Sequence, residues 1–447
     1  MNKKIYTDLF RQHRSTIDGA CAGGLNAPRE KAFDDFDRMG FPPFLSEDYQ
    51  QTNLEEAFAF NYGLNFKRLP FPLNPENVFR CDVPNLSTAL YFVVNDGFYV
   101  QHRPKTHLPE SVFSGSLNAF AAQFPEIFQR YYTVQADTSS DELAAFNTMF
   151  VQDGYVLYIP ENTILERPIQ LINILTGNVD ALYNRRMLVI VGKNAQAKLL
   201  VCDHTSEENH KFLTTQVTEI FVDENAVFDL YELEESSINT TRVASTFVSQ
   251  QAGSNVMINA TTLYNGLTRN NYYVDLNGEH AETGLSGIAI LGERQHTDNF
   301  VKVVHHLPNC SSNQLFKYVL DDHSTGVFTG RILVDSGAQK TNACQTNKNL
   351  CVTREAKMFS KPQLEIYADD VKCSHGMTTG QLDENALFYL RSRGIPEKQA
   401  RLLLMYAFTV DVLDHIRIDA VKDRLRRLVE KRFKGELSKC AGCCNKC

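Results

Sequence analysis

The sequence predicts a mainly β protein with a β-helix core and helical segments at both ends. Three observations lead to this fold class. Between residue 151 and about residue 375, many short apolar stretches are separated by Gly, Asn, Asp and Thr, which is typical of consecutive strands. Two turn sequences, VGKNAQA at 191–197 and VDENAVF at 222–228, resemble each other at a separation of 31 positions. No helical pattern interrupts these strands.

A third turn, VDSGAQK at 334–340, has the same character. A turn followed by a strand at a fixed period is typical of a solenoid, because each coil covers the open face of the preceding one. A sandwich of two sheets also produces short strands at regular spacing, so this pattern alone leaves the sandwich open as an alternative. We assign the β-helix core to residues 151–376.

The segments on either side of this core have helical patterns. Residues 1–150 form a mainly helical domain in which Asn53 is a candidate helix cap. Residues 377–435 form a second helical domain, where Asp383 can cap the first helix. Its second helix runs through residues 402–410, which are apolar almost all round. We expect that helix to pack on several sides or to meet a partner.

A third, basic helix is expected at residues 419–433, ending at Gly435. The final segment, residues 436–447, is a cysteine-rich tail. These two predictions complete the division of the chain into four parts.

Composition excludes several classes of function. The 447-residue chain has a net charge of -8 and no basic cluster, which argues against nucleic acid as a partner. Its longest apolar run, residues 402–410, is far shorter than the roughly 20 residues needed to span a bilayer. The start of the chain lacks the apolar core of a secretory signal, so we expect a cytoplasmic protein without a membrane partner. Its 11 cysteines are then expected to be reduced thiols.

The usual catalytic motifs are missing from the sequence. It contains no GxxxxGK[ST] phosphate loop, no GxGxxG after a strand, no GxSxG and no HExxH. Residues 336–341, SGAQKT, include Lys and Thr but lack the glycine that a phosphate loop requires before them. We therefore expect no catalytic residues in this chain, and any ATP-driven step would need another subunit.

Cys373 and His375 stand two residues apart just before Gly376. In an extended strand these two side chains point the same way, with their Cα atoms roughly 6.6 Å apart. A thiolate and an imidazole can then converge on one ion, since Zn–S and Zn–N bonds are about 2.3 and 2.1 Å long. A closed structural site usually takes four ligands, so a metal here would need ligands from elsewhere. On the residues alone, a packed cysteine beside a solvated histidine is also possible.

The run PQLEIYADDVKCSHG at 362–376, followed by LFYLRSRGI at 387–395, resembles the C-terminal signature of the SufB/SufD family of iron-sulfur cluster assembly proteins. The SufD members are the more similar. GRILVDSGAQKTNACQTNKNL at 330–350 supports the resemblance. YQQTNL at 49–54 is similar to the family's N-terminal box, with the first and third aromatic positions altered. The similarity covers about residue 49 to about residue 433.

This resemblance implies a right-handed parallel β-helix between helical domains. It implies two partners: a SufB-like β-helix protein at the C-terminal end of the β-helix, and a SufC-like ABC-type ATPase on the helices around residues 387–408. The motif histidine, here His375 with Cys373 beside it, would face a cysteine of the SufB-like partner where a nascent cluster forms. Iron, an iron-sulfur cluster and a reduced flavin are all candidates for the bound species. A homodimer is the alternative to the heteromer.

The tail KCAGCCNKC carries four thiols: Cys440, Cys443, Cys444 and Cys447. Two Cys-x-x-Cys pairs abut, and this spacing allows the two thiolates of each pair to bind one soft ion. Common four-ligand zinc sites separate their pairs by a long loop, which is missing here. Metal binding and a redox-sensitive terminus both remain open.

Two rival functions follow from these patterns. A β-helix polysaccharide lyase or hydrolase would need paired carboxylates or a calcium site in a sugar-binding groove. A stand-alone metal-binding protein would use the cysteine tail. The resemblance favours a SufD-like scaffold subunit over both.

Overall fold

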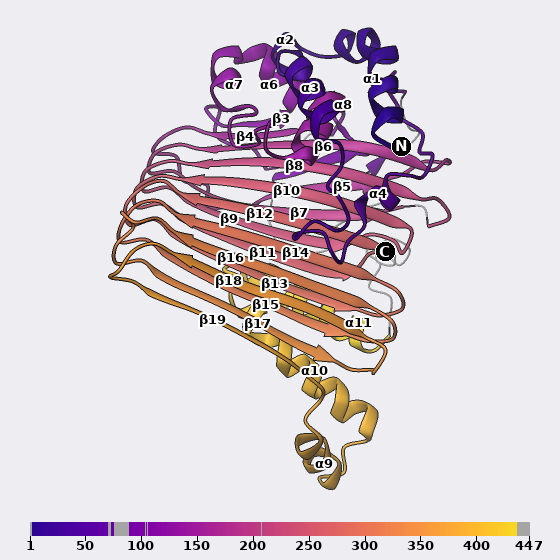
Figure 1. Cartoon of the computed structure of the whole chain (residues 1–447), viewed down its shortest axis with the longest axis vertical. Helices are drawn as coiled ribbons and strands as arrows, with labels where there is room; N and C mark the ends of the chain where they lie inside the picture. Colours follow the sequence, from indigo (N-terminus) through magenta and orange to yellow (C-terminus); the bar gives the residue numbers. More distant parts are fainter. Residues whose placement is uncertain are drawn as a thin grey trace.

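The computed structural model describes residues 2–69, 73–75, 89–102, 104, 106–206 and 208–435. Its core consists of two long sheets, in which strands from successive coils lie side by side (Figure 1). Each full coil contributes one strand to each sheet, and the coils pair in parallel. This is a parallel β-helix, so the predicted fold class is confirmed and a sandwich is excluded.

Sheet A contains β3 (Phe113–Ser116), β4 (Tyr155–Ile159), β6 (Ala181–Val191), β8 (Phe212–Val222), β10 (Thr240–Gln250), β12 (Leu267–Leu276), β14 (His296–His305), β16 (Thr325–Val334) and β18 (Lys357–Ile366). Sheet B contains β1 (Ala89–Val94), β2 (Gly97–Phe98), β5 (Ile169–Leu175), β7 (Gln196–Thr205), β9 (Val227–Glu235), β11 (Asn255–Tyr264), β13 (Glu282–Leu291), β15 (Ser311–Leu320), β17 (Asn342–Cys351) and β19 (Lys372–Gly380). In both sheets, the strands of the coils pair in chain order, and in sheet B the short strand β2 lies outside β1.

The repeated turns lie at one corner of the solenoid. Val191 pairs with Val222, and Val222 pairs with Gln250, so successive coils advance by about the predicted period. Asn194 and Asn225 occupy this corner in consecutive coils with φ of 56° and 55°, a left-handed conformation that asparagine tolerates. Asn225 Nδ2 donates to Asn194 Oδ1 at 3.4 Å, which links the two coils. The corner sequence therefore recurs because each coil must make the same tight turn.

The N-terminal helices lie at one end of the stack, over the outer face of the first coils of sheet A (Figure 1). They are α1 (Asn2–Gly19), α2 (Gly23–Asn26), α3 (Arg29–Met39), α4 (Leu54–Ala57), α6 (Leu117–Gln123), α7 (Pro125–Tyr131) and α8 (Glu142–Phe150). Residues 1–150, where helices are expected, also contain the short strands β1 and β3. Of these, β1 pairs with β5 and β3 pairs with β4. These short strands cover the first coil, whose edges would otherwise be free.

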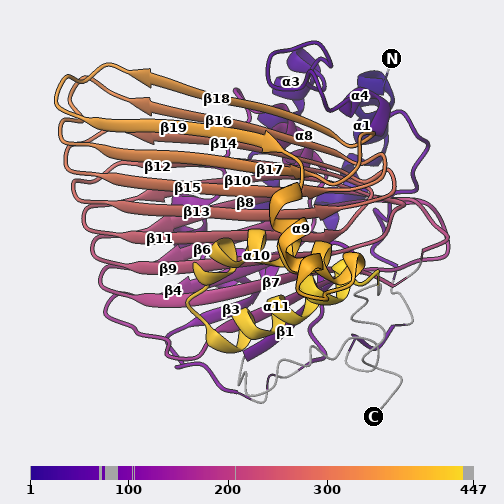
Figure 2. The ribbon, with the colours of Figure 1, turned by 90° about the horizontal axis from the view of Figure 1, so that it is seen from below.

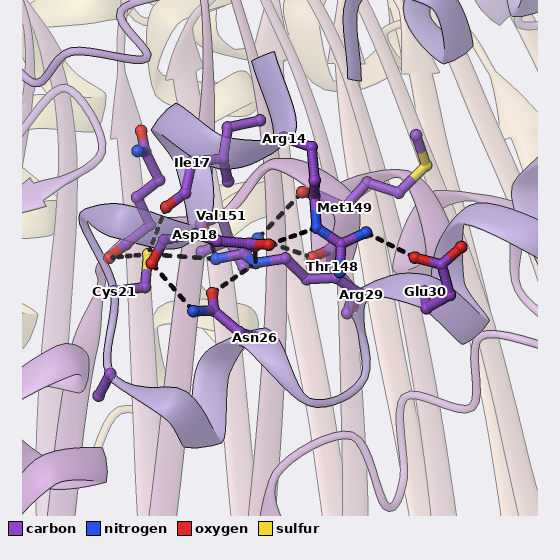
Figure 3. Close-up of polar contacts among 12 residues, drawn as sticks. Arg14, Ile17, Asp18, Cys21, Asn26, Arg29, Glu30, Thr148, Met149 and Val151 are labelled. Carbon is purple, nitrogen blue, oxygen red and sulfur yellow. Dashed lines mark hydrogen bonds and ion pairs between the residues drawn. The ribbon is translucent and has the colours of Figure 1, made fainter. Parts of the chain in front are cut away.

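Arg29 fastens these helices together (Figure 3). Its side chain is fully buried, and its guanidinium donates to the carbonyls of Thr148, Met149 and Val151 at 3.1, 2.9 and 2.6 Å. These carbonyls lie at the C-terminal end of α8, where backbone acceptors lack partners within the helix. One arginine of α3 therefore caps α8, and a cation at a helix C-terminus is favourable.

The YQQTNL box connects the N-terminal domain to sheet A. The Tyr49 ring centroid lies 4.5 Å from the Arg269 guanidinium on β12. Two residues before it, Glu47 bonds to Lys361 Nζ on β18 at 2.5 Å. At its end, Asn53 Oδ1 accepts from the backbone of the first turn of α4, which confirms the predicted cap. The box and the residues just before it thus reach from α4 to the last coil.

The C-terminal helices are α9 (Glu384–Ser392), α10 (Glu397–Asp414) and α11 (Asp419–Phe433). α10 and α11 pack on the outer face of sheet B, whereas α9 extends beyond the last coil (Figures 1 and 2). Asp383 Oδ1 accepts from the first backbone N–H groups of α9, as predicted. The third helix also has its predicted bounds, with Gly435 at φ 75° just after it. No helix in the described part of the chain is long and apolar enough to cross a membrane.

Candidate functional site

The last coil leaves both sheets with a free edge. Among the described strands, β18 pairs only with β16, and β19 pairs only with β17 (Figures 1 and 2). At the start of β19, Lys372 N donates to Thr341 O at 2.8 Å, toward the preceding coil. Backbone groups alternate sides along a strand, so those of Cys373, His375 and Met377 point away from β17. Such a row of outward N–H and C=O groups is a template for pairing with another strand.

The structure places Cys373 and His375 on the same face of β19, as predicted. Both face the interior of the solenoid, since Cys373 packs against an apolar cluster that includes Ile332 and Ala343. Cys373 is half-buried, and His375 is exposed at the open end of the solenoid. A thiol and an imidazole therefore lie on one face of the strand at the rim of the last coil.

Cys373 and His375 do not share a strand with the residues at 365–366, because β18 ends at Ile366 and β19 begins at Lys372. The solenoid turns its corner between these strands, and Lys340 N donates there to Asp370 O. The alternation that unites Cys373 and His375 survives because both residues belong to β19.

Burial raises the pKa of the Cys373 thiol, and a hydrogen bond from the Ala343 backbone opposes this effect. The thiol is therefore protonated in the chain alone near neutral pH. A metal ion must displace that proton to bind the thiolate, so metal binding at this rim is linked to proton release.

The described residues of the rim do not form a complete metal site. In the described part of the chain, no group of three or more His, Cys, Asp or Glu side chains could hold a metal ion. Cys373 and His375 are thus two donors without further ligands among those residues. The other predicted metal ligands, Cys440, Cys443, Cys444 and Cys447, lie outside the described residues.

Sequence analysis missed the residues beneath the rim. Gln345 is the β17 neighbour of His375, and Gln314 is the β15 neighbour of Gln345. Both amides are buried, and Gln345 Nε2 donates to Gln314 Oε1 at 2.7 Å. The signal was available in NACQTNKNL, where Gln345, Asn347 and Asn349 alternate along one strand. Alternating polar residues ordinarily indicate a solvated face, whereas here they face inward.

His305 and His306 follow each other in sequence, but among the described residues they form no group of metal-binding side chains. His305 is fully buried, and His306 lies on the opposite face of the chain, half-exposed between Asp275 and Asp335. The two rings therefore lie on opposite sides of the chain. Burial lowers the pKa of His305 to about 4, with a smaller contribution from the charge of His306. His305 is therefore a neutral core residue that bonds to Ser312 Oγ at 2.9 Å.

An apolar surface lies beyond the rim on α9 and the first half of α10. Phe388 is 74% exposed, Tyr389 is 57% exposed and Leu403 is 50% exposed. The second half of α10 is packed on sheet B through Val412 and Leu413. The apolar pattern of the second helix thus serves both packing and an exposed surface. Large exposed apolar groups that lie together mark surfaces for partners.

The comparisons with known proteins agree with these features. Residues 174–408 match the family described as SUF system FeS cluster assembly, SufBD core domain, and residues 1–171 match the SufBD protein N-terminal region. An iron-sulfur cluster assembly SufBD family protein of Synechocystis sp. is 30% identical over 447 residues, covering 97% of this chain and 98% of the relative. The chain belongs to the SufBD family.

Two relatives of this SufBD chain are named SufD. The iron-sulfur cluster assembly protein SufD of Escherichia coli is 38% identical over 167 residues, which are 37% of this chain and 40% of the relative. SufD of Bacillus subtilis is 27% identical over 327 residues, covering 72% of this chain and 74% of the relative. The SufBD core match contains both Cys373 and His375 and ends within α10, before the cysteine tail.

Proposed function

We propose that this SufBD chain is a SufD-like scaffold subunit that works in the cytoplasm and has no catalytic activity of its own. It helps a SufB-like β-helix protein to acquire iron and to form nascent iron-sulfur clusters. The observation that carries this proposal is the rim of the last coil, where Cys373 and His375 lie on an edge strand without further ligands in the described chain. The cargo is iron or a nascent cluster, which binds transiently and is not stored.

The SufB-like protein docks on the two free edges. Pairing of a strand along a sheet edge gives affinity through backbone bonds, and side chains near the edge give specificity. Phe359, Ile366, Tyr367 and Met377 surround the rim and are each at least 39% exposed. Pro362 lies on the edge strand β18, where a missing N–H is tolerated. In isolation, the same edges can pair two copies of this chain.

A SufC-like ABC-type ATPase binds the apolar surface of α9 and α10. The link from this surface to the rim is Lys317 on β15, whose side chain is 5% exposed. Its Nζ donates to Phe408 O at 2.7 Å and pairs with Asp411 at 2.6 Å, both on α10. Because β15, β17 and β19 are neighbours, movement of α10 during ATP hydrolysis strains the edge that carries His375.

The test is iron loading of the complete complex. Wild-type chain, His375→Ala and His323→Ala are each co-expressed with the SufB-like and SufC-like partners, and iron and acid-labile sulfide are counted per complex. His323 is an exposed corner histidine and serves as the matched control. We expect His375→Ala to lose iron and sulfide while His323→Ala keeps both. Unchanged loading and cluster delivery in His375→Ala would remove this histidine from the mechanism.

A further inference from the structure

One column of side chains in the solenoid interior changes from aliphatic residues to amides just below His375. Register partners on this inward face follow each other from coil to coil: Leu199, Leu230, Ile258, Leu285, Gln314, Gln345 and His375. The four aliphatic members are at most 1% exposed. Gln314 and Gln345 are equally buried, at 0% and 1%. The same interior therefore holds hydrocarbon in four coils and amides in the last two coils beneath the imidazole.

Packing does not explain these amides. The bond between Gln345 Nε2 and Gln314 Oε1 uses only one donor and one acceptor of the pair. Gln345 Oε1 and Gln314 Nε2 are buried without a hydrogen-bond partner in the described chain. A buried amide atom without a partner destabilises the folded state, so leucine would suit this column better. Such an exception calls for a role outside stability.

Gln345 is held in a defined position. Its amide extends across the interior to Gly330 on β16, where an added Cβ would lie 2.1 Å from Gln345 Nε2. Gly330 therefore leaves the space that the amide fills, and Gln314 fixes its orientation from below. Neighbouring strands are about 4.8 Å apart, and His375 is the register partner of Gln345 on the last strand, with its side chain exposed at the open end. The unpaired amide oxygen is a buried acceptor one register position from His375.

We propose that Gln345 positions His375 for its cargo. Gln345 Oε1 is unpaired among the residues that the structure describes. When the exposed imidazole turns inward, this oxygen accepts a hydrogen bond from one imidazole N–H, and the other ring nitrogen is left unprotonated and free to bind metal. A histidine that binds a metal ordinarily donates its second nitrogen in this way, which fixes both the tautomer and the ring orientation. This inference rests on the proposed function, in which His375 is a ligand. Gln345 itself touches no cargo and acts through His375.

The test observes the imidazole directly, in the full chain without metal. In chain labelled with ¹⁵N-histidine at mildly alkaline pH, nitrogen chemical shifts report the tautomer, and His375→Ala identifies the signals. We expect one dominant tautomer in the wild type and a mixture in Gln345→Leu, which restores the side chain of the earlier coils. Gln345→Glu keeps an acceptor oxygen and should preserve the single tautomer.

Gln216→Leu is the matched control. Gln216 is another buried interior amide whose Oε1 has no partner in the described chain, and it lies on β8, far from the rim. This variant should leave the His375 signals unchanged. In the complex, Gln345→Leu should weaken iron binding about 10-fold to 100-fold, and Gln345→Glu should restore it.

An unchanged tautomer ratio in Gln345→Leu would overturn the positioning role, whatever the iron content. Should that variant fail to fold, the same bond can be followed from the amide. The side-chain carbonyl signal of Gln345 should shift in His375→Ala, a variant that removes only an exposed side chain. An unshifted signal would also overturn the positioning role of Gln345. The proposed function fails separately, through normal iron loading of His375→Ala.

Discussion

A proline on the outer edge of β19 would separate partner binding from folding. Met377 is 47% exposed, and its N–H points away from β17, so Met377→Pro removes no bond of the solenoid ladder. Proline is tolerated on edge strands, and β18 already contains Pro362. We expect the free energy of unfolding to change by less than about 1 kcal/mol.

Binding of the SufB-like partner should respond far more strongly. A strand paired along β19 uses the outward N–H of Met377, and the proline ring also blocks the adjacent bond. Two lost bonds at about 0.5–1.5 kcal/mol each weaken the complex by about 1–3 kcal/mol, or about 5-fold to 150-fold in Kd. Met377→Val keeps the N–H and changes only the side chain, so it should weaken binding much less than Met377→Pro.

The assay is titration of the purified chain with the SufB-like partner by calorimetry, with circular dichroism melting of each variant alone. Equal affinities for Met377→Pro and Met377→Val, with both variants folded, would refute strand pairing along β19. A Met377→Pro chain that melts well below the wild type would instead show that this N–H belongs to the solenoid ladder.

Two further predictions concern the interior and the apolar surface. Burial raises the pKa of Glu234 to about 7, so the folded state holds this proton more tightly than the unfolded chain. The resulting stability, on the order of 3 kcal/mol, is present below about pH 4.5 and lost as the pH rises through 7. In Glu234→Gln, the urea midpoint should change less with pH across this range than it does in the wild type. An equal dependence of the midpoint on pH in both proteins would contradict the reasoning. Phe388→Asp should fold normally but should no longer co-purify with the ATPase. Val179→Asp, at another exposed apolar site, should still co-purify with it. Retention of the ATPase by Phe388→Asp would exclude α9 as its docking site.

The β-helix could be predicted because its corners repeat. Asn194 and Asn225 recur in the sequence since each coil needs a left-handed residue at the same place. The last helices were also predictable, because Asp383 and Gly435 are local signals for a helix start and a helix end. Strands β1 and β3 were not, since their pairing partners β5 and β4 lie outside the segment and only tertiary contact decides their conformation.

The candidate site likewise contains some residues that could be predicted from the sequence and others that could not. Cys373 and His375 could be found because their spacing along one strand is a local property. Gln345 and Gln314 could not, because their role depends on the register between coils, and a single strand does not reveal which of its faces is the interior. The ligands that complete the site belong to another chain in this account, so they are not residues of this sequence.

The most direct test of the incomplete site compares iron retention by the chain alone and by its complex. Each sample is exposed to ferrous iron without oxygen, desalted and assayed for bound metal, with a Cys373→Ser and His375→Ala double variant in parallel. The account predicts that the complex retains iron, that the double variant in complex does not, and that the chain alone retains none through these residues. Iron held by the isolated chain and lost in its double variant would show a site complete without a partner, contradicting the central claim.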